Sequence, residues 1–85
     1  MLNEILFIEG MRDYRRIHTA TKRIMTLQTF KDLELEIPER IICRVHKSYM
    51  VAIDKIESIE KDEIKIGGIY IPVSETYKKR FYELL

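Results

Sequence analysis

The stretch over residues 43–51, CRVHKSYMV, constrains this chain more than any other. Its apolar and aromatic residues enclose four side chains that can donate hydrogen bonds: Arg44, His46, Lys47 and Ser48. No acidic residue occurs over 41–53, although 34% of the chain is charged. A segment that keeps cations and lacks anions usually faces a negative partner, and these donors suit phosphate oxygens and base edges. The alternative is an ordinary edge strand that runs into a loop, with solvated cations and a hydrogen-bonded His46.

Charge elsewhere alternates in blocks along the sequence. The formal net charge is only +1, but basic residues concentrate over 10–23, 40–47 and 75–80, and acidic residues over 31–39 and 54–66. If the fold brings the three basic blocks together, the domain has a positive face despite its nearly neutral total.

The composition predicts one small globular domain. Eighty-five residues with 46% hydrophobic content suffice for a single core. No apolar run approaches the ~20 residues of a membrane span, and no signal peptide is recognisable. The single cysteine, Cys43, excludes an internal disulfide and fits a reducing, cytoplasmic setting.

Catalysis and metal binding are not expected from these residues. Cys43 and His46 are three apart, but no third orienting group stands at recognisable spacing. One cysteine and two histidines give no metal-ligand pattern. We therefore expect neither an enzyme nor a cofactor.

The pattern along the chain predicts six or seven short strands and two helices. Apolar or alternating runs favour strands over 5–8, 14–18, 23–27, 50–53, 56–61, 63–67 and 69–71. A polar turn joins the second and third strands into a hairpin, and Gly67-Gly68 predicts another hairpin. Because strands do not alternate regularly with helices, we expect a mainly β fold of mostly antiparallel sheets with peripheral helices.

Both helices are predicted from capping residues and helical spacing. Leu27, Phe30, Leu33 and Ile37 share one face of the first helix, with Thr26 or Thr29 as N-cap and Pro38 as its stop. The second helix is expected over 75–85 with Ser74 as N-cap.

The order of these motifs resembles the LytTR (LytR/AlgR-type) DNA-binding domain of bacterial response regulators over essentially all of residues 1–85. Residues 44–51 match the family's R-x-H-[RK]-S-[FY]-x-V core. The segments LFIE followed by Tyr14, and IPVS at 71–74, match secondary signatures in the correct order.

The resemblance implies an elongated arrangement of small β-sheets with two short helices. Loops, rather than a helix, would enter successive major grooves of double-stranded DNA at repeated promoter sites, and two copies would pair on DNA. The chain would be the effector domain of a two-component regulator, with its receiver domain removed. It would also lack one or two strands that usually precede Asn3, which would leave residues 5–8 as an unpaired sheet edge.

Carried over residue by residue, the resemblance places three contact segments on this chain. The first is at or beside Arg15. The second is the His46-Lys47-Ser48 turn, with Lys47 at the base-contacting position. The third follows Ser74, where Glu75 replaces an often basic residue, so that contact is doubtful or shifts to Thr76, Lys78 or Lys79.

The predicted DNA-binding residues are therefore Arg15, Arg44, His46, Lys47, Ser48, Lys78 and Lys79. Of these, Arg44 and Lys47 are expected to carry most of the affinity. His46 either donates to a phosphate or fixes the turn, and Ser48 is more typical of a turn residue than of a ligand.

The alternative function is a small β-rich module for protein interaction or dimerisation without specific DNA readout. The position of Arg15, Lys47 and Lys78 discriminates between the two. One shared face favours DNA, whereas scattered cations and an open edge at residues 5–8 favour protein pairing.

Overall fold

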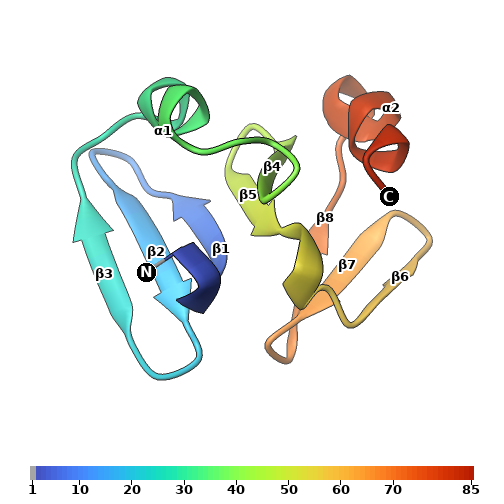
Figure 1. The fold of residues 1–85 in the computed structure, drawn as a ribbon, viewed down its shortest axis with the longest axis horizontal. Helices are drawn as coiled ribbons and strands as arrows, with labels where there is room; N and C mark the ends of the chain where they lie inside the picture. Colours follow the sequence, from blue (N-terminus) through green and yellow to red (C-terminus); the bar gives the residue numbers. More distant parts are fainter. Residues whose placement is uncertain (1) are drawn as a thin grey trace.

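The computed structural model describes residues 2–85, which form eight β-strands and two α-helices (Figure 1). Two short 3-10 turns lie at Leu2–Glu4 and Ile53–Lys55. The main elements in order are β1 (Ile5–Gly10), β2 (Arg15–Thr19), β3 (Arg23–Thr26), α1 (Phe30–Glu36), β4 (Ile42–His46), β5 (Tyr49–Ala52), β6 (Ser58–Glu60), β7 (Glu63–Ile66), β8 (Ile69–Pro72) and α2 (Glu75–Glu83). The predicted six or seven strands were too few, because the stretch over 43–51 folds into two strands joined by a turn.

The strands form two antiparallel sheets, which confirms the expected mainly β class. One sheet has the order β3-β2-β1-β5-β4 and the other the order β6-β7-β8. The core has two apolar clusters: one lies between α1 and the five-stranded sheet, and the other joins both sheets to α2. Phe30 and Leu33 of α1 pack with Ile8 of β1, and Phe81 of α2 packs with Val45 and Ile64. No helix in residues 2–85 is long and apolar enough to cross a membrane.

Strand β1 lies inside its sheet, so the prediction of an unpaired edge at residues 5–8 was wrong. It pairs with β2 on one side and with β5 on the other. In the second pairing Phe7 stands opposite Val51 and Ile8 opposite Met50. The central stretch therefore folds back onto β1 and covers the edge that was expected to be open because strands before Asn3 were thought to be missing.

Capping and stop signals set the ends of α1 as predicted. The Thr29 side chain accepts from the Asp32 backbone N–H, and the Asp32 carboxylate accepts from the Thr29 N–H, which forms a capping box. The helix ends with Ile37 as its C-cap, directly before Pro38. Leu27 is the exception to the predicted apolar face, because it precedes the helix and is 78% exposed.

Residue conformation also fixes the hairpin turns of the smaller sheet. Gly67 and Gly68 have φ of 56° and 79°, the left-handed values that a two-residue hairpin turn requires. Lys61 and Asp62 adopt φ of 53° and 60° in the β6–β7 turn, which the sequence pattern did not predict.

Candidate nucleic-acid interface

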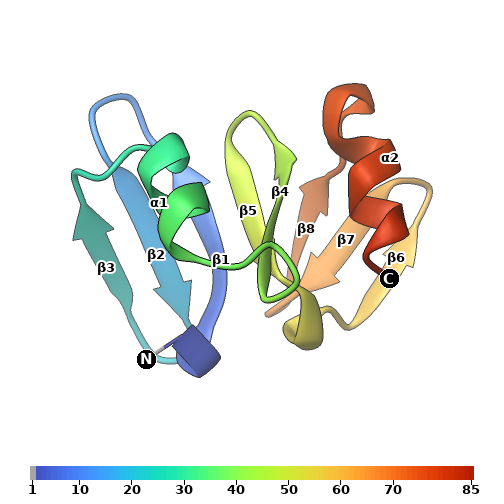
Figure 2. The same cartoon turned by 45° about the horizontal axis from the view of Figure 1, so that its top comes forward.

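Three chain segments reach the same side of the molecule: the β1–β2 loop, the β4–β5 turn and the connection from β8 to α2. Figure 2 shows all three toward the top of the view. Backbone hydrogen bonds join them. The Gly10 N–H donates to the Ser48 carbonyl at 2.7 Å, and the Ser74 N–H donates to the Val45 carbonyl at 2.9 Å. The predicted contact segments are therefore neighbours held by main-chain bonds, although they lie far apart in sequence.

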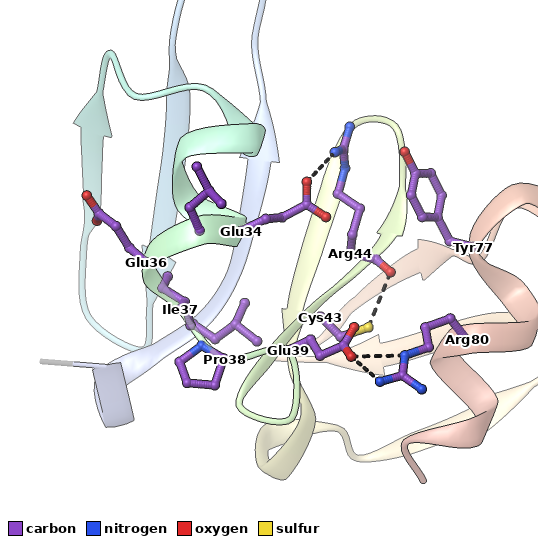
Figure 3. Close-up of a pocket in the computed structure, with 11 residues that line it drawn as sticks. Glu34, Glu36, Ile37, Pro38, Glu39, Cys43, Arg44, Tyr77 and Arg80 are labelled. Carbon is purple, nitrogen blue, oxygen red and sulfur yellow. Dashed lines mark hydrogen bonds and ion pairs between the residues drawn. The ribbon is translucent and has the colours of Figure 1, made fainter.

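Arg44 holds the β4–β5 turn from beneath. Its Nε donates to the His46 carbonyl at 2.9 Å, and its second terminal nitrogen donates to the Lys47 carbonyl at 2.7 Å. The other terminal nitrogen bonds a carboxylate oxygen of Glu34 at 3.2 Å (Figure 3). Only 17% of the Arg44 side chain is exposed. The guanidinium is thus occupied by partners within the chain.

The turn leaves one cation fully available. Lys47 is exposed, and its side chain has no partner within the described residues 2–85. The Ser48 backbone N–H donates to Nδ1 of His46 at 3.1 Å. Because Nδ1 accepts that bond, the neutral ring carries its proton on Nε2 and can donate from there. The backbone of Ser48 therefore orients His46, and Lys47 projects from the tip.

A stack of alternating arginine and aromatic side chains lies under the contact segments. The guanidinium carbon of Arg15 is 5.7 Å from the Phe30 ring centroid, and that of Arg44 is 4.3 Å from it. The Arg44 guanidinium carbon is also 5.2 Å from the Tyr77 ring centroid. These four residues, named here the arginine–aromatic stack, join β2, α1, β4 and α2 by cation–π contacts.

Arg15 has an unsatisfied donor within this stack. Its Nε is buried, and no acceptor lies within hydrogen-bond distance among the described residues. The neighbouring Arg16 differs, because it donates to the Tyr14 hydroxyl at 3.2 Å and lies 3.9 Å from a Glu9 carboxylate oxygen. Of the two adjacent arginines, Arg15 is therefore the one with a buried donor left unsatisfied.

The two lysines of α2 differ in their surroundings. Lys78 lies 2.8 Å from a carboxylate oxygen of Asp62 and 3.9 Å from one of Glu75. Its bond to Asp62 raises the pKa of Lys78 and lowers the pKa of Asp62. Lys79 is exposed and has no partner in the described part of the chain, and the Glu75 side chain is 92% exposed. Lys79 is therefore the freer cation of this segment.

The groove between α1 and α2 offers no reactive thiol (Figure 3). Cys43 lines it but is only 2% exposed, and burial, with a smaller contribution from Glu39, raises its thiol pKa to about 11. The thiolate is therefore scarce near neutral pH. Within residues 2–85, no three side chains of His, Cys, Asp or Glu gather to hold a metal ion.

Sequence reasoning missed the residues that organise the interface. Helical spacing placed Phe30 on an apolar helix face, and nothing in the pattern indicated that arginines from β2 and β4 would stack on Phe30 and Tyr77. The first strand was predicted over 5–8, so Gly10 received no role. A Cβ added at Gly10 would lie 2.7 Å from Cε2 of Phe30, so the close approach of β1 to α1 requires glycine there.

Replacing Gly10 by alanine should therefore disturb the stack directly. We expect the displaced Phe30 ring to lower the free energy of unfolding by about 1–3 kcal/mol, as overpacking does. Urea denaturation of Gly10→Ala measures this change. As a control, Gly68→Ala adds a Cβ that meets no atom within 4 Å, so any cost there comes from its positive φ alone. An unchanged Gly10→Ala midpoint would mean that Phe30 is not held tightly.

Comparisons with known proteins agree with this architecture. The family model described as the LytTr DNA-binding domain matches residues 1–85. A solved structure described as the LytTr DNA-binding domain of a response regulator from Bacillus cereus is similar, with a TM-score of 0.91 at 19% sequence identity. That similarity covers 98% of this chain and 82% of the other. The comparison with curated proteins returned no match. On the evidence of the family model, the chain belongs to the LytTr family of DNA-binding domains.

Proposed function

We propose that this domain binds specific double-stranded DNA sequences and regulates transcription as the effector of a two-component response regulator. Its contact segments would enter successive major grooves at repeated promoter sites. The observation that carries the proposal is Lys47, an exposed and unpartnered cation at the tip of a turn that Arg44 fixes from below. A rigid turn with a free cation suits base-edge readout, because the side chain alone adapts to the groove.

Each predicted DNA-binding residue then takes a role that fits its surroundings. Lys47 contacts a base edge, and Arg15 contacts a phosphate oxygen through the terminal nitrogens of its guanidinium rather than through its buried Nε. His46, which the Ser48 backbone N–H orients, donates from Nε2 to the phosphate backbone of the DNA. The phosphate contacts at the third segment come from Lys79, with Lys78 weakened by its pairing to Asp62.

The role of Arg44 is best supported as positioning. A direct DNA contact by Arg44 stays a prediction, but its nitrogens already bond two turn carbonyls and Glu34. Such a residue acts on DNA through the shape of the turn and through the placement of Lys47.

The dimensions of the domain support contact with more than one groove. Its longest extent is 30 Å, and one turn of B-DNA advances about 34–36 Å. A domain of this length is comparable to one turn of the duplex, which is compatible with contacts to successive major grooves. We further propose that two copies bind together in the cytoplasm and that a receiver domain controls their pairing.

The alternative of a protein-interaction module without DNA readout has less support. It depended on an open apolar edge at residues 5–8, and β1 is instead paired on both sides. It also depended on scattered cations, whereas the β1–β2 loop, the β4–β5 turn and the β8–α2 connection reach one side of the molecule (Figure 2).

The proposal is tested by titrating duplex DNA with a Lys47→Ala variant at several salt concentrations. We expect affinity for the preferred site to fall by ~1–3 kcal/mol, and discrimination at one base position to relax. Lys22→Ala is the matched control, since Lys22 is exposed in the β2–β3 turn, at the opposite end of β2 from Arg15. Equal losses for both variants on all sequences would contradict base readout by Lys47.

A further inference from the structure

The tip of the β1–β2 hairpin carries an arginine that faces solvent. Strands β1 and β2 pair as far as Gly10 opposite Arg15, and beyond them the Met11 N–H donates to the Tyr14 carbonyl at 2.8 Å. That bond closes the hairpin one pair further, so only Arg12 and the residue after it remain at the tip. The side chain of Arg12 is exposed. Its backbone is therefore held at a defined point, and its guanidinium projects from there.

The β4–β5 hairpin has the same construction. His46 stands opposite Tyr49, which leaves Lys47 and Ser48 as its two tip residues. In each hairpin the first tip residue is an exposed cation without a hydrogen bond or an ion pair among residues 2–85. Arg12 thus holds the position in the β1–β2 hairpin that Lys47 holds in the β4–β5 hairpin.

The two tips are close together on the same side of the molecule. The Gly10 N–H donates to the Ser48 carbonyl at 2.7 Å, and Figure 2 shows both hairpins ending toward the top of the view. Because the strand order is β2-β1-β5-β4, the centres of the two hairpins are two strand spacings apart. Spacings of about 4.8 Å place the tips about 10 Å apart, or about three base pairs of B-DNA at about 3.4 Å each. A duplex that meets Lys47 therefore also lies within reach of Arg12.

Of the three arginines over residues 11–16, Arg12 has the most available guanidinium. Arg15 stacks over the Phe30 ring and has a buried Nε. Arg16 donates to the Tyr14 hydroxyl at 3.2 Å. Arg12 has neither a stacking partner nor a hydrogen bond within the described part of the chain, so both terminal nitrogens can bind one ligand edge together.

The residue beside Arg12 determines which kind of contact this tip suits. Asp13 is also exposed, so the tip carries one cation and one anion and no net charge. A neutral tip has little long-range attraction for phosphates, whereas Lys47 has no acid beside it. Arg12 binds best where hydrogen-bond geometry counts and phosphate oxygens, which the carboxylate repels, are distant. A base edge in a groove is such a position.

We propose that Arg12 reads a guanine in the major groove and is the specificity-determining residue of the β1–β2 hairpin, while Arg15 contacts phosphate beside it. This role rests on the proposed DNA binding and adds a base identity to it. The planar fork of arginine matches the O6 and N7 acceptors of guanine, and this pair is the commonest specific contact to DNA. Since the tips are about 10 Å apart, the guanine lies within about half a helical turn, about five base pairs, of the base that Lys47 reads.

Selection of bound duplexes from a random pool tests the base that Arg12 reads. We expect the parent protein to enrich a motif with a guanine at one position, and Arg12→Ala to enrich the same motif with roughly tenfold weaker preference for that guanine. The position that Lys47→Ala relaxes should lie within about half a turn of it. Relaxation at a base other than guanine, or a separation of a full turn or more, would overturn the role of Arg12.

Two controls separate base readout from the loss of a charge. Arg12→Lys keeps the charge but not the fork, so it should recover little of the guanine preference. Arg23→Ala removes the same charge at an exposed position opposite His18, at the other end of β2 from the contact segments, and should leave every base preference unchanged. Urea denaturation should give Arg12→Ala the midpoint of the parent, because the side chain is exposed and unpaired. A parent that enriches no motif would overturn both the proposed function and this role, whereas a motif that Arg12→Ala enriches unchanged would overturn this role alone.

A modified base tests the hydrogen bond itself. Replacing the enriched guanine by 7-deazaguanine removes the N7 acceptor that faces the major groove. We expect the parent to lose roughly tenfold in affinity for this duplex and Arg12→Ala to lose less than about twofold, because the variant has no donor left to lose its partner. Lys47→Ala retains Arg12 and should lose as much as the parent. Equal losses for the parent and Arg12→Ala, or no loss for the parent, would show that Arg12 does not contact guanine even though the domain binds specific DNA.

Discussion

Replacing Arg44 by alanine is expected to lower both the stability of the domain and its affinity for DNA. The substitution removes donors to two turn carbonyls and Glu34, and two cation–π contacts with Phe30 and Tyr77. Hydrogen bonds from a charged donor contribute about 1.5–3 kcal/mol and cation–π contacts about 0.5–2 kcal/mol. Since these terms do not add fully, we expect the free energy of unfolding to fall by about 3 kcal/mol. Urea denaturation and a DNA titration below the unfolding transition measure the two effects.

Two further variants show which contacts of Arg44 matter. Arg44→Lys keeps the charge but not the forked geometry, so we expect it to regain less than half of the lost stability. Glu34→Ala removes only a partly exposed ion pair, which should cost below ~1 kcal/mol. If Arg44→Ala lost DNA affinity with no loss of stability, Arg44 would be a direct DNA contact and the positioning role would be wrong.

Replacing Phe30 by alanine should have the largest effect of any change in the stack. The ring is 6% exposed in the cluster that joins α1 to β1 and β5, and it lies between the guanidinium groups of Arg15 and Arg44. Truncation of a buried phenylalanine costs about 3–5 kcal/mol. Small domains typically have a free energy of unfolding of about 5–15 kcal/mol, so a loss of this size would leave the folded state only marginally stable.

Phe30→Leu separates packing from the stack. Leucine fills much of the space but has no π face, so we expect most of the stability to return while DNA affinity stays reduced. Chemical denaturation and one-site DNA titration report these quantities separately. Leu35→Ala on the exposed side of α1, where the side chain is 82% exposed, should change neither. A Phe30→Leu protein that binds DNA as well as the parent would show that the stack does not position the contact segments.

Local signals in the sequence predicted most of the fold. Thr29 and Pro38 set the ends of α1, and Gly67-Gly68 set the β7–β8 turn, because capping and turn chemistry act within a few residues. The predictions were wrong where contacts between distant segments of the chain determine the structure. Leu27 fits helical spacing but precedes the helix. The edge expected at residues 5–8, from strands missing before Asn3, is instead covered by a strand more than 40 residues later.

In the candidate interface, too, local sequence predicted some residues, whereas others depend on tertiary contacts. Lys47 could be singled out because it stands in a turn free of acidic residues, which is a local property. The contacts of Arg44 could not be predicted from the sequence, since its partners include Phe30, Glu34 and Tyr77 from other elements. Sequence spacing also could not distinguish Lys78, paired across the fold with Asp62, from the free Lys79.

The most direct test of the central claim is selection of bound duplexes from a random DNA pool at moderate salt, with parent and Lys47→Ala proteins in parallel. We expect the parent protein to enrich a defined motif and the Lys47→Ala variant to lose discrimination at one or more positions within it. Failure of the parent to enrich any motif, with binding that only fades as salt rises, would contradict specific readout by this domain.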